Sequence, residues 1–169
     1  MEKQGIWLMI IRYALIILAI FALPWFYIIL RPVTTYLSYG LIRIFYQAQM
    51  SGNFILFKGY SIEIIDACVA GIAYFLLLFL NLSTRLIGTW KRILLFLFTS
   101  AVFLVVNVVR IFLMTLLLVN QSGLFDVAHL VFWYALSVVF VFLIWVLSIK
   151  VFRIREIPVY SDVKAIFRK

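Results

Sequence analysis

The chain has 169 residues, of which 67% are hydrophobic and only 12% are charged. Soluble domains carry about 25% charged residues, so a soluble fold of this length could not hide so much apolar surface, whereas a bilayer can cover it. The net charge of +9 does not indicate nucleic-acid binding, because the basic residues lie between and after long apolar runs, the pattern that orients membrane proteins.

The first apolar run, residues 6–30, is long enough to cross a bilayer. It has no small-x-small cleavage site at its end, so we predict a retained anchor rather than a signal peptide. Arg12 lies near its first end and is expected to snorkel toward the interface. Pro24 is expected to kink the far end, and Arg31-Pro32 to end the helix.

The next stretch, residues 31–65, contains no long apolar run and is predicted to lie outside the membrane core. Between residues 33 and 48, apolar residues at helical spacing predict an amphipathic helix on the membrane surface. These residues are Val33, Leu37, Leu41, Ile44, Phe45 and Ala48. Ser51-Gly52-Asn53 is expected to break this helix.

Two short β-prone stretches follow, residues 54–57 and 61–65, joined by Lys58-Gly59-Tyr60. They predict a small β-hairpin. Because open sheet edges are not tolerated in lipid, the hairpin should lie at the interface or against protein.

Three more apolar runs, residues 66–82, 93–119 and 127–149, complete about four predicted transmembrane helices, and a basic tail covers residues 150–169. The sequence therefore predicts a single integral membrane domain. Its fold class is an all-α membrane protein with an outer surface helix and a small interfacial β-hairpin.

The charges predict the orientation of the chain. With the N-terminus inside, ten basic residues fall on cytoplasmic segments and three on outer segments. The outer three are Arg31, Arg43 and Lys58. The bias favours both termini in the cytoplasm, because inner loops carry the excess of Lys and Arg.

Three chemistry-bearing residues are then predicted toward the outer face: Cys68, Arg110 and His129. Cys68 is the only cysteine, Arg110 is the only base deep within a span, and His129 is the only histidine. An arginine near a helix centre costs about 2.5–3.5 kcal/mol on insertion scales and usually marks function, although a structural arginine would pair with a carbonyl or an acid. Asn107, one turn earlier on the same helix face, could hold the guanidinium or donate to a substrate oxygen.

Each of the other candidates also has a purely structural interpretation. A lone cysteine is most often a buried small hydrophobe, but the first turn of a helix favours the thiolate of Cys68. His129 could contact lipid headgroups. Asp66 and Asp126 could cap their helices, or one of them could orient His129.

Together, a thiol, a histidine and a cation form a plausible nucleophilic site. In it Cys68 would attack, and His129 would take and return a proton. Arg110 would stabilise a developing oxyanion, a role equally open to backbone amides. With one cysteine and no histidine cluster, the sequence predicts no metal site, and no cofactor is implied.

These residues resemble the exosortase/archaeosortase family of membrane cysteine transpeptidases. The resemblance lies in Asp66-Ala67-Cys68-Val69-Ala70-Gly71 at a helix start, Asn107-Val108-Val109-Arg110 within the next helix, and His129 at the start of the last. It covers about residues 63–133. The family commonly has Cys-Ser-Gly or Cys-Thr-Gly, whereas Val69 and Ala70 follow the cysteine here. The short chain looks most like the small archaeal members.

The resemblance implies a substrate class. The family's clients are surface proteins whose C-terminal sorting signal consists of a short motif, a transmembrane helix and a basic cluster. The enzyme cuts near the motif at the outer face of the cell membrane and passes the new C-terminus to a lipid or similar amine acceptor. Two rival hypotheses remain: a protease that releases its product to water, and a non-enzymatic membrane subunit that uses Arg110 to pair with a partner transmembrane helix.

Overall fold

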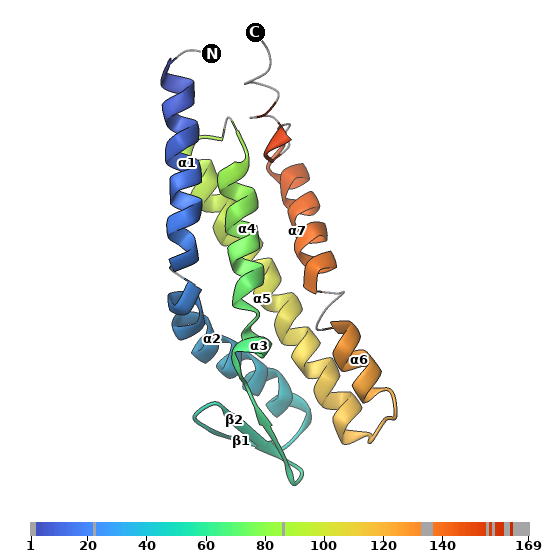
Figure 1. The fold of residues 1–169 in the computed structure, drawn as a ribbon. Coiled ribbons are helices and arrows are strands. Elements are labelled where there is room, and N and C mark those ends of the chain that lie inside the picture. Colours follow the sequence, from blue (N-terminus) through green and yellow to red (C-terminus); the bar gives the residue numbers. More distant parts are fainter. Residues whose placement is uncertain are drawn as a thin grey trace.

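The computed structural model describes residues 3–21, 23–85, 87–132, 137–154, 156, 158–160 and 163. Its elements are α1 (Lys3–Phe21), α2 (Leu23–Phe45), β1 (Ala48–Ser51), β2 (Phe54–Phe57), β3 (Tyr60–Glu63), α3 (Asp66–Val69), α4 (Gly71–Ser83), α5 (Thr89–Val119), α6 (Phe125–Val131) and α7 (Ser137–Val151). Figure 1 shows an elongated bundle, with the start of α1 and the end of α7 at one end and the small sheet and α6 at the other.

Two of the four predicted spans are confirmed by length and composition within the described residues. They are Asp66–Ser83, which contains α3 and α4, and α5. The α1–α2 pair, bent by 61°, adds a third if it forms one span. The predicted span 127–149 is divided between α6 and α7, and its residues 133–136 lie outside the described residues. α7 has 15 residues, fewer than the about 20 that a straight span needs.

The first span differs from the prediction in where it bends and where it ends. The bend lies between Phe21 and Leu23, and Pro24 is the second residue of α2, where its missing N–H is one that a helix leaves unpaired anyway. Pro32 does not end the helix but lies inside α2. Membrane helices tolerate proline in this way because neighbouring groups satisfy the freed backbone.

The predicted surface helix over residues 33–48 is therefore not a separate element. It is the second half of α2, which ends at Phe45, and Ala48 begins a strand. Three small polar residues, Thr34, Thr35 and Ser38, form the buried face of this segment together with Ile42. Most of the predicted apolar stripe points outward, because small polar side chains allow close helix packing while lipid covers the large apolar ones.

The predicted hairpin is confirmed as β2 and β3, which pair antiparallel around Lys58-Gly59. Both turn residues have positive φ, as a two-residue hairpin loop of type I′ requires. The prediction missed β1, which pairs with β2 to give the sheet order β1-β2-β3. Gly52-Asn53, interpreted as a helix breaker, is the turn between β1 and β2, with Gly52 at a φ of 60°.

One buried cluster joins α2, the sheet, α3 and α5 and thereby fixes the segment that carries Cys68. Its members are Ile42, Ile55, Phe57, Ile64, Val69 and Ile111. At the opposite end of the bundle, Arg12 donates to the carbonyl of Thr84 at 3.0 Å, and its snorkelling stays a prediction. Arg92 donates to the same carbonyl at 3.0 Å, so these guanidiniums cover carbonyls that the end of α4 leaves unpaired.

The helix predicted over residues 66–82 is interrupted just after Cys68. Ala70 adopts the left-handed conformation (φ 56°, ψ 44°) and separates α3 from α4. The following residue, Gly71, lies against the ring of Tyr27 in α2: a Cβ at this position would come within 2.6 Å of two ring carbons. A larger residue here would therefore force the Tyr27 ring to move, so the close approach of α2 and α4 beside Cys68 favours glycine.

This contact predicts a stability effect. Gly71→Ala should destabilise the protein by about 1–3 kcal/mol, because the methyl group forces the Tyr27 ring and α2 away from α4. Gly40→Ala is the control: Gly40 lies within α2 with no atom within 4 Å of the added Cβ, and alanine favours a helix. Thermal unfolding in detergent, followed by tryptophan fluorescence, should show a lower midpoint for Gly71→Ala only. Equal midpoints for the two variants would contradict the predicted clash.

Candidate active site

Cys68 lies in the single turn α3, between the sheet and α5. Its backbone N–H donates to the carbonyl of Ile65 at 2.9 Å, and its Sγ lies 4.0 Å from the carbonyl oxygen of Glu63. The thiol is half-buried. Because Ala70 cuts α3 off after one turn, the dipole acting on Cys68 is weaker than that of the continuous helix we predicted.

Two side chains of α5 hold the backbone at Cys68. Asn107 Nδ2 donates to the carbonyl oxygen of Cys68 at 2.8 Å, and Arg110 Nη2 lies 3.5 Å from the same oxygen. These two residues are one turn apart on one face of α5, as the sequence indicated. Asn107 is 2% exposed, and its Oδ1 has no hydrogen-bond partner among the described residues. The pair ties the short turn α3 to the long helix α5.

His129 comes from α6, at the same end of the bundle as the sheet (Figure 1). Its ring stacks on that of Phe125, with centroids 5.9 Å apart and planes 2° from parallel. This stacking between residues four apart on one helix fixes the face on which the imidazole lies.

A cavity of about 150 Å³ brings the three predicted residues together. Cys68, Arg110 and His129 all line it, from α3, α5 and α6 respectively. Most of its remaining wall is apolar and includes Ile64 and Met114. The cavity therefore places a thiol, a guanidinium and an imidazole around an apolar space large enough for one side chain.

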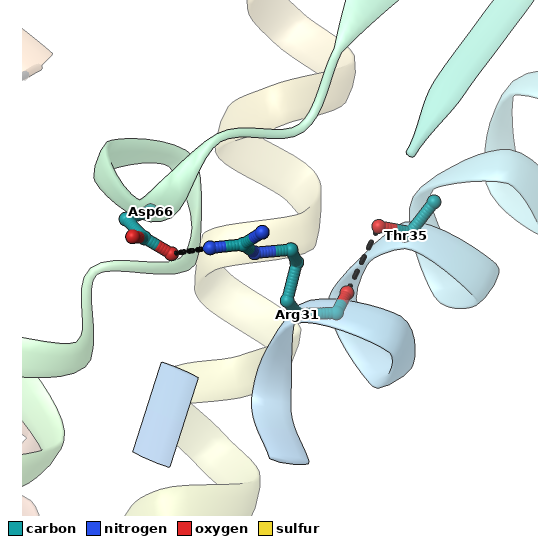
Figure 2. Close-up of polar contacts among 3 residues, drawn as sticks. All are labelled: Arg31, Thr35 and Asp66. Carbon is teal, nitrogen blue, oxygen red and sulfur yellow. Dashed lines mark hydrogen bonds and ion pairs between the residues drawn. The ribbon is translucent and has the colours of Figure 1, made fainter. Parts of the chain in front are cut away.

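The two predicted supporting acids lie differently. Asp66 forms an ion pair with Arg31 of α2, as Figure 2 shows, rather than acting as the N-cap, which is Ile65. Asp126 lies in α6, one turn before His129; the N-cap of that helix is Leu124, with no side-chain capping hydrogen bond.

Sequence reasoning missed Arg31 as a candidate site residue, because its charge was used only to predict the orientation of the chain. Arg31 links α2 to the turn that carries Cys68, and Thr35 donates to its carbonyl at 2.9 Å (Figure 2). A second cavity of about 300 Å³ lies beside Asp66, the partner of Arg31, and is also lined by Ala67 and Arg110 among others. Arg110 and Ala67 thus border both cavities. The sequence signal that could have identified Arg31 was its charge, beside Pro32 within an apolar run.

The arrangement places a thiol, an imidazole and a guanidinium around one cavity, and these are groups that thiol chemistry uses. No group of three or more His, Cys, Asp or Glu residues that could hold a metal ion occurs in the described part of the chain. A thiol beside an imidazole and a guanidinium is a combination that can support nucleophilic attack on a carbonyl group.

Comparison with known families shows which family the chain matches. A family model described as transmembrane exosortase (Exosortase_EpsH) matches residues 2–147, which include all three cavity residues. No curated protein and no solved structure matches the chain. Since the matched region covers most of the chain and contains the apolar helices described above, the chain belongs to the transmembrane exosortase family, whose members are generally cysteine peptidases or transpeptidases.

Proposed function

We propose that this protein is a membrane cysteine transpeptidase that cleaves the C-terminal sorting signals of surface proteins at the outer face of the cell membrane. The observation that carries the proposal is the cavity shared by Cys68, Arg110 and His129, in a chain of the exosortase family. Cys68 attacks the scissile carbonyl and forms a thioester, Arg110 stabilises the oxyanion, and His129 returns a proton to the leaving amine.

The acceptor completes the proposed reaction. An amine of a lipid or similar acceptor attacks the thioester of Cys68, which transfers the new C-terminus of the substrate and restores the thiol. Attack by water instead would make the protein a simple protease. Mass spectrometry of the new C-terminus of a co-expressed surface protein with a motif, an apolar helix and a basic cluster tests both reactions. An added acceptor mass supports transfer, a free carboxylate supports hydrolysis alone, and an uncut protein contradicts the proposed function.

The proposed orientation places the sheet, α6 and Cys68 outside and both termini in the cytoplasm. It is supported by the ten-to-three charge bias and by the position of the sheet at the end of the bundle opposite to the start of α1 (Figure 1). The substrate's motif would leave the membrane at the same outer face.

This orientation predicts which reagents reach Cys68. An impermeant maleimide should label Cys68 in intact cells, because the half-buried thiol lines an open cavity at the outer face. The control is Trp90→Cys in a Cys68→Ala background. Trp90 is 72% exposed at the start of α5, which is the cytoplasmic end of that helix in the proposed orientation. Its cysteine should be labelled only after the cells are permeabilised. The reverse labelling pattern would place Cys68 in the cytoplasm and remove surface proteins as substrates.

A further inference from the structure

β3 is an edge strand that leads directly to the candidate nucleophile. The sheet order is β1-β2-β3, so within the described residues no strand pairs with the outer side of β3. Ile64 and Ile65 connect β3 to α3, which carries Cys68. An unpaired strand edge offers hydrogen bonds to any extended peptide laid beside it.

The turn geometry shows which backbone groups face that edge. Phe57 and Tyr60 flank the two-residue turn Lys58-Gly59, and the residues that flank such a turn exchange hydrogen bonds with each other. Hydrogen-bonded and non-bonded pairs alternate along an antiparallel ladder. The backbone groups of Tyr60 and Ile62 therefore point toward β2.

Two contacts beyond the turn agree with this alternation. The N–H of Ile64 donates to the carbonyl of Asn53 at 2.9 Å, on the β2 side. The backbone groups of Ser61 and Glu63 therefore point away from β2. The carbonyl oxygen of Glu63 accordingly lies 4.0 Å from Cys68 Sγ, so the open edge of β3 ends at the thiol.

The side chains of the same segment indicate what lies beside this edge. Ile62 and Ile64 share one face of the strand and line the cavity that holds Cys68. An extended peptide alternates its side chains between two faces. A strand laid along β3 would therefore direct every second side chain toward this apolar cavity of about 150 Å³, which is large enough for one large apolar side chain.

From these observations we infer that β3 binds the substrate peptide as a fourth strand of the sheet. The outward backbone groups of Ser61 and Glu63 bond to the peptide, an apolar side chain next to the scissile bond fills the cavity, and the scissile carbonyl is delivered to Cys68. The inference rests on the proposed function, since it concerns how that substrate is held.

Proline substitution tests the strand edge, because proline removes a backbone N–H. Ser61→Pro removes an outward N–H and no β2–β3 hydrogen bond, and edge strands tolerate proline at such positions. We expect the KM for the surface protein to rise about tenfold, because a tenfold change corresponds to the loss of about one hydrogen bond. The rate at which iodoacetamide alkylates Cys68 should stay unchanged.

Met50→Pro is the matched control on the opposite edge of the same sheet. Ser51 and Phe54 flank the turn Gly52-Asn53, so the N–H of Met50 also points away from β2. Its substitution should change the KM less than twofold. A KM for Ser61→Pro equal to that of Met50→Pro would overturn the inference.

A second measurement uses the unmodified chain and so does not depend on how Ser61→Pro folds. Synthetic peptides covering the mapped cleavage point are N-methylated at one residue each and tested as inhibitors of processing. Methylation at every second residue should weaken inhibition about tenfold, and methylation between them should have little effect. Inhibition without this alternation, by a chain that processes its substrate through Cys68, would overturn strand pairing alone. A chain that processes no such substrate would refute the proposed function, and the inference would fall with it.

Discussion

Cys68→Ala, His129→Ala and the double variant should each leave a co-expressed surface protein uncut, and to similar extents. Residues that act as one catalytic unit are strongly non-additive, so losing either one costs about as much as losing both. In the proposed reaction the thiol forms the thioester and the imidazole returns a proton to the leaving amine. The cavity that contains both side chains is the structural reason to treat them as a unit.

Processing in cells at matched expression measures this effect. Cys68→Ser should also fail, because a hydroxyl is far less acidic than a thiol and Arg110 cannot make up the difference. Val127→Ala controls for damage to α6: Val127 is 62% exposed on the helix that carries His129 and should be dispensable. Cys68→Ala should still bind its substrate, so the full-length protein should co-purify with it. Full processing by Cys68→Ala would eliminate covalent catalysis.

Local sequence patterns correctly predicted elements whose geometry depends on residues that are close in the sequence. The connection Lys58-Gly59-Tyr60 predicted the hairpin correctly, because a short connection with a glycine is a local signal, although Tyr60 is already the first residue of β3. α5 was predicted to end at Val119, as it does, since an uninterrupted apolar run has few alternatives in a bilayer. The same local reasoning failed at Pro32, because a proline that would break a helix in water is tolerated in a membrane helix.

Long-range contacts could not be read from the pattern. Arg31 and Asp66 are 35 residues apart, and only the fold brings α2 against α3 to form their ion pair (Figure 2). The left-handed Ala70 was equally hidden, because an alanine within an apolar run predicts helix rather than an interruption. The grouping of Cys68 and Arg110 was predictable in outline, since Cys68 was placed at the outer start of its helix and Arg110 in the outer half of the next.

Arg110→Lys should lose most of the activity while the protein still folds. Lysine keeps the positive charge but lacks the planar guanidinium with its five donors. In the structure one guanidinium nitrogen lies 3.5 Å from the backbone carbonyl oxygen of Cys68, and the side chain borders both cavities, so the guanidinium lies beside the space proposed for the attacked carbonyl. Removing one oxyanion donor typically lowers a rate by about 10²–10³.

Single-turnover rates of substrate cleavage should therefore fall by about that factor for Arg110→Ala, with Arg110→Lys closer to alanine than to arginine. Val105→Ala is the control for α5, because Val105 is 62% exposed on the same helix and touches neither cavity. Near-normal turnover by Arg110→Lys would show that charge alone suffices. Near-normal turnover by Arg110→Ala would remove Arg110 from the chemistry and leave it as a structural tie between α5 and the backbone of Cys68, a role that Asn107 already shares through its 2.8 Å hydrogen bond.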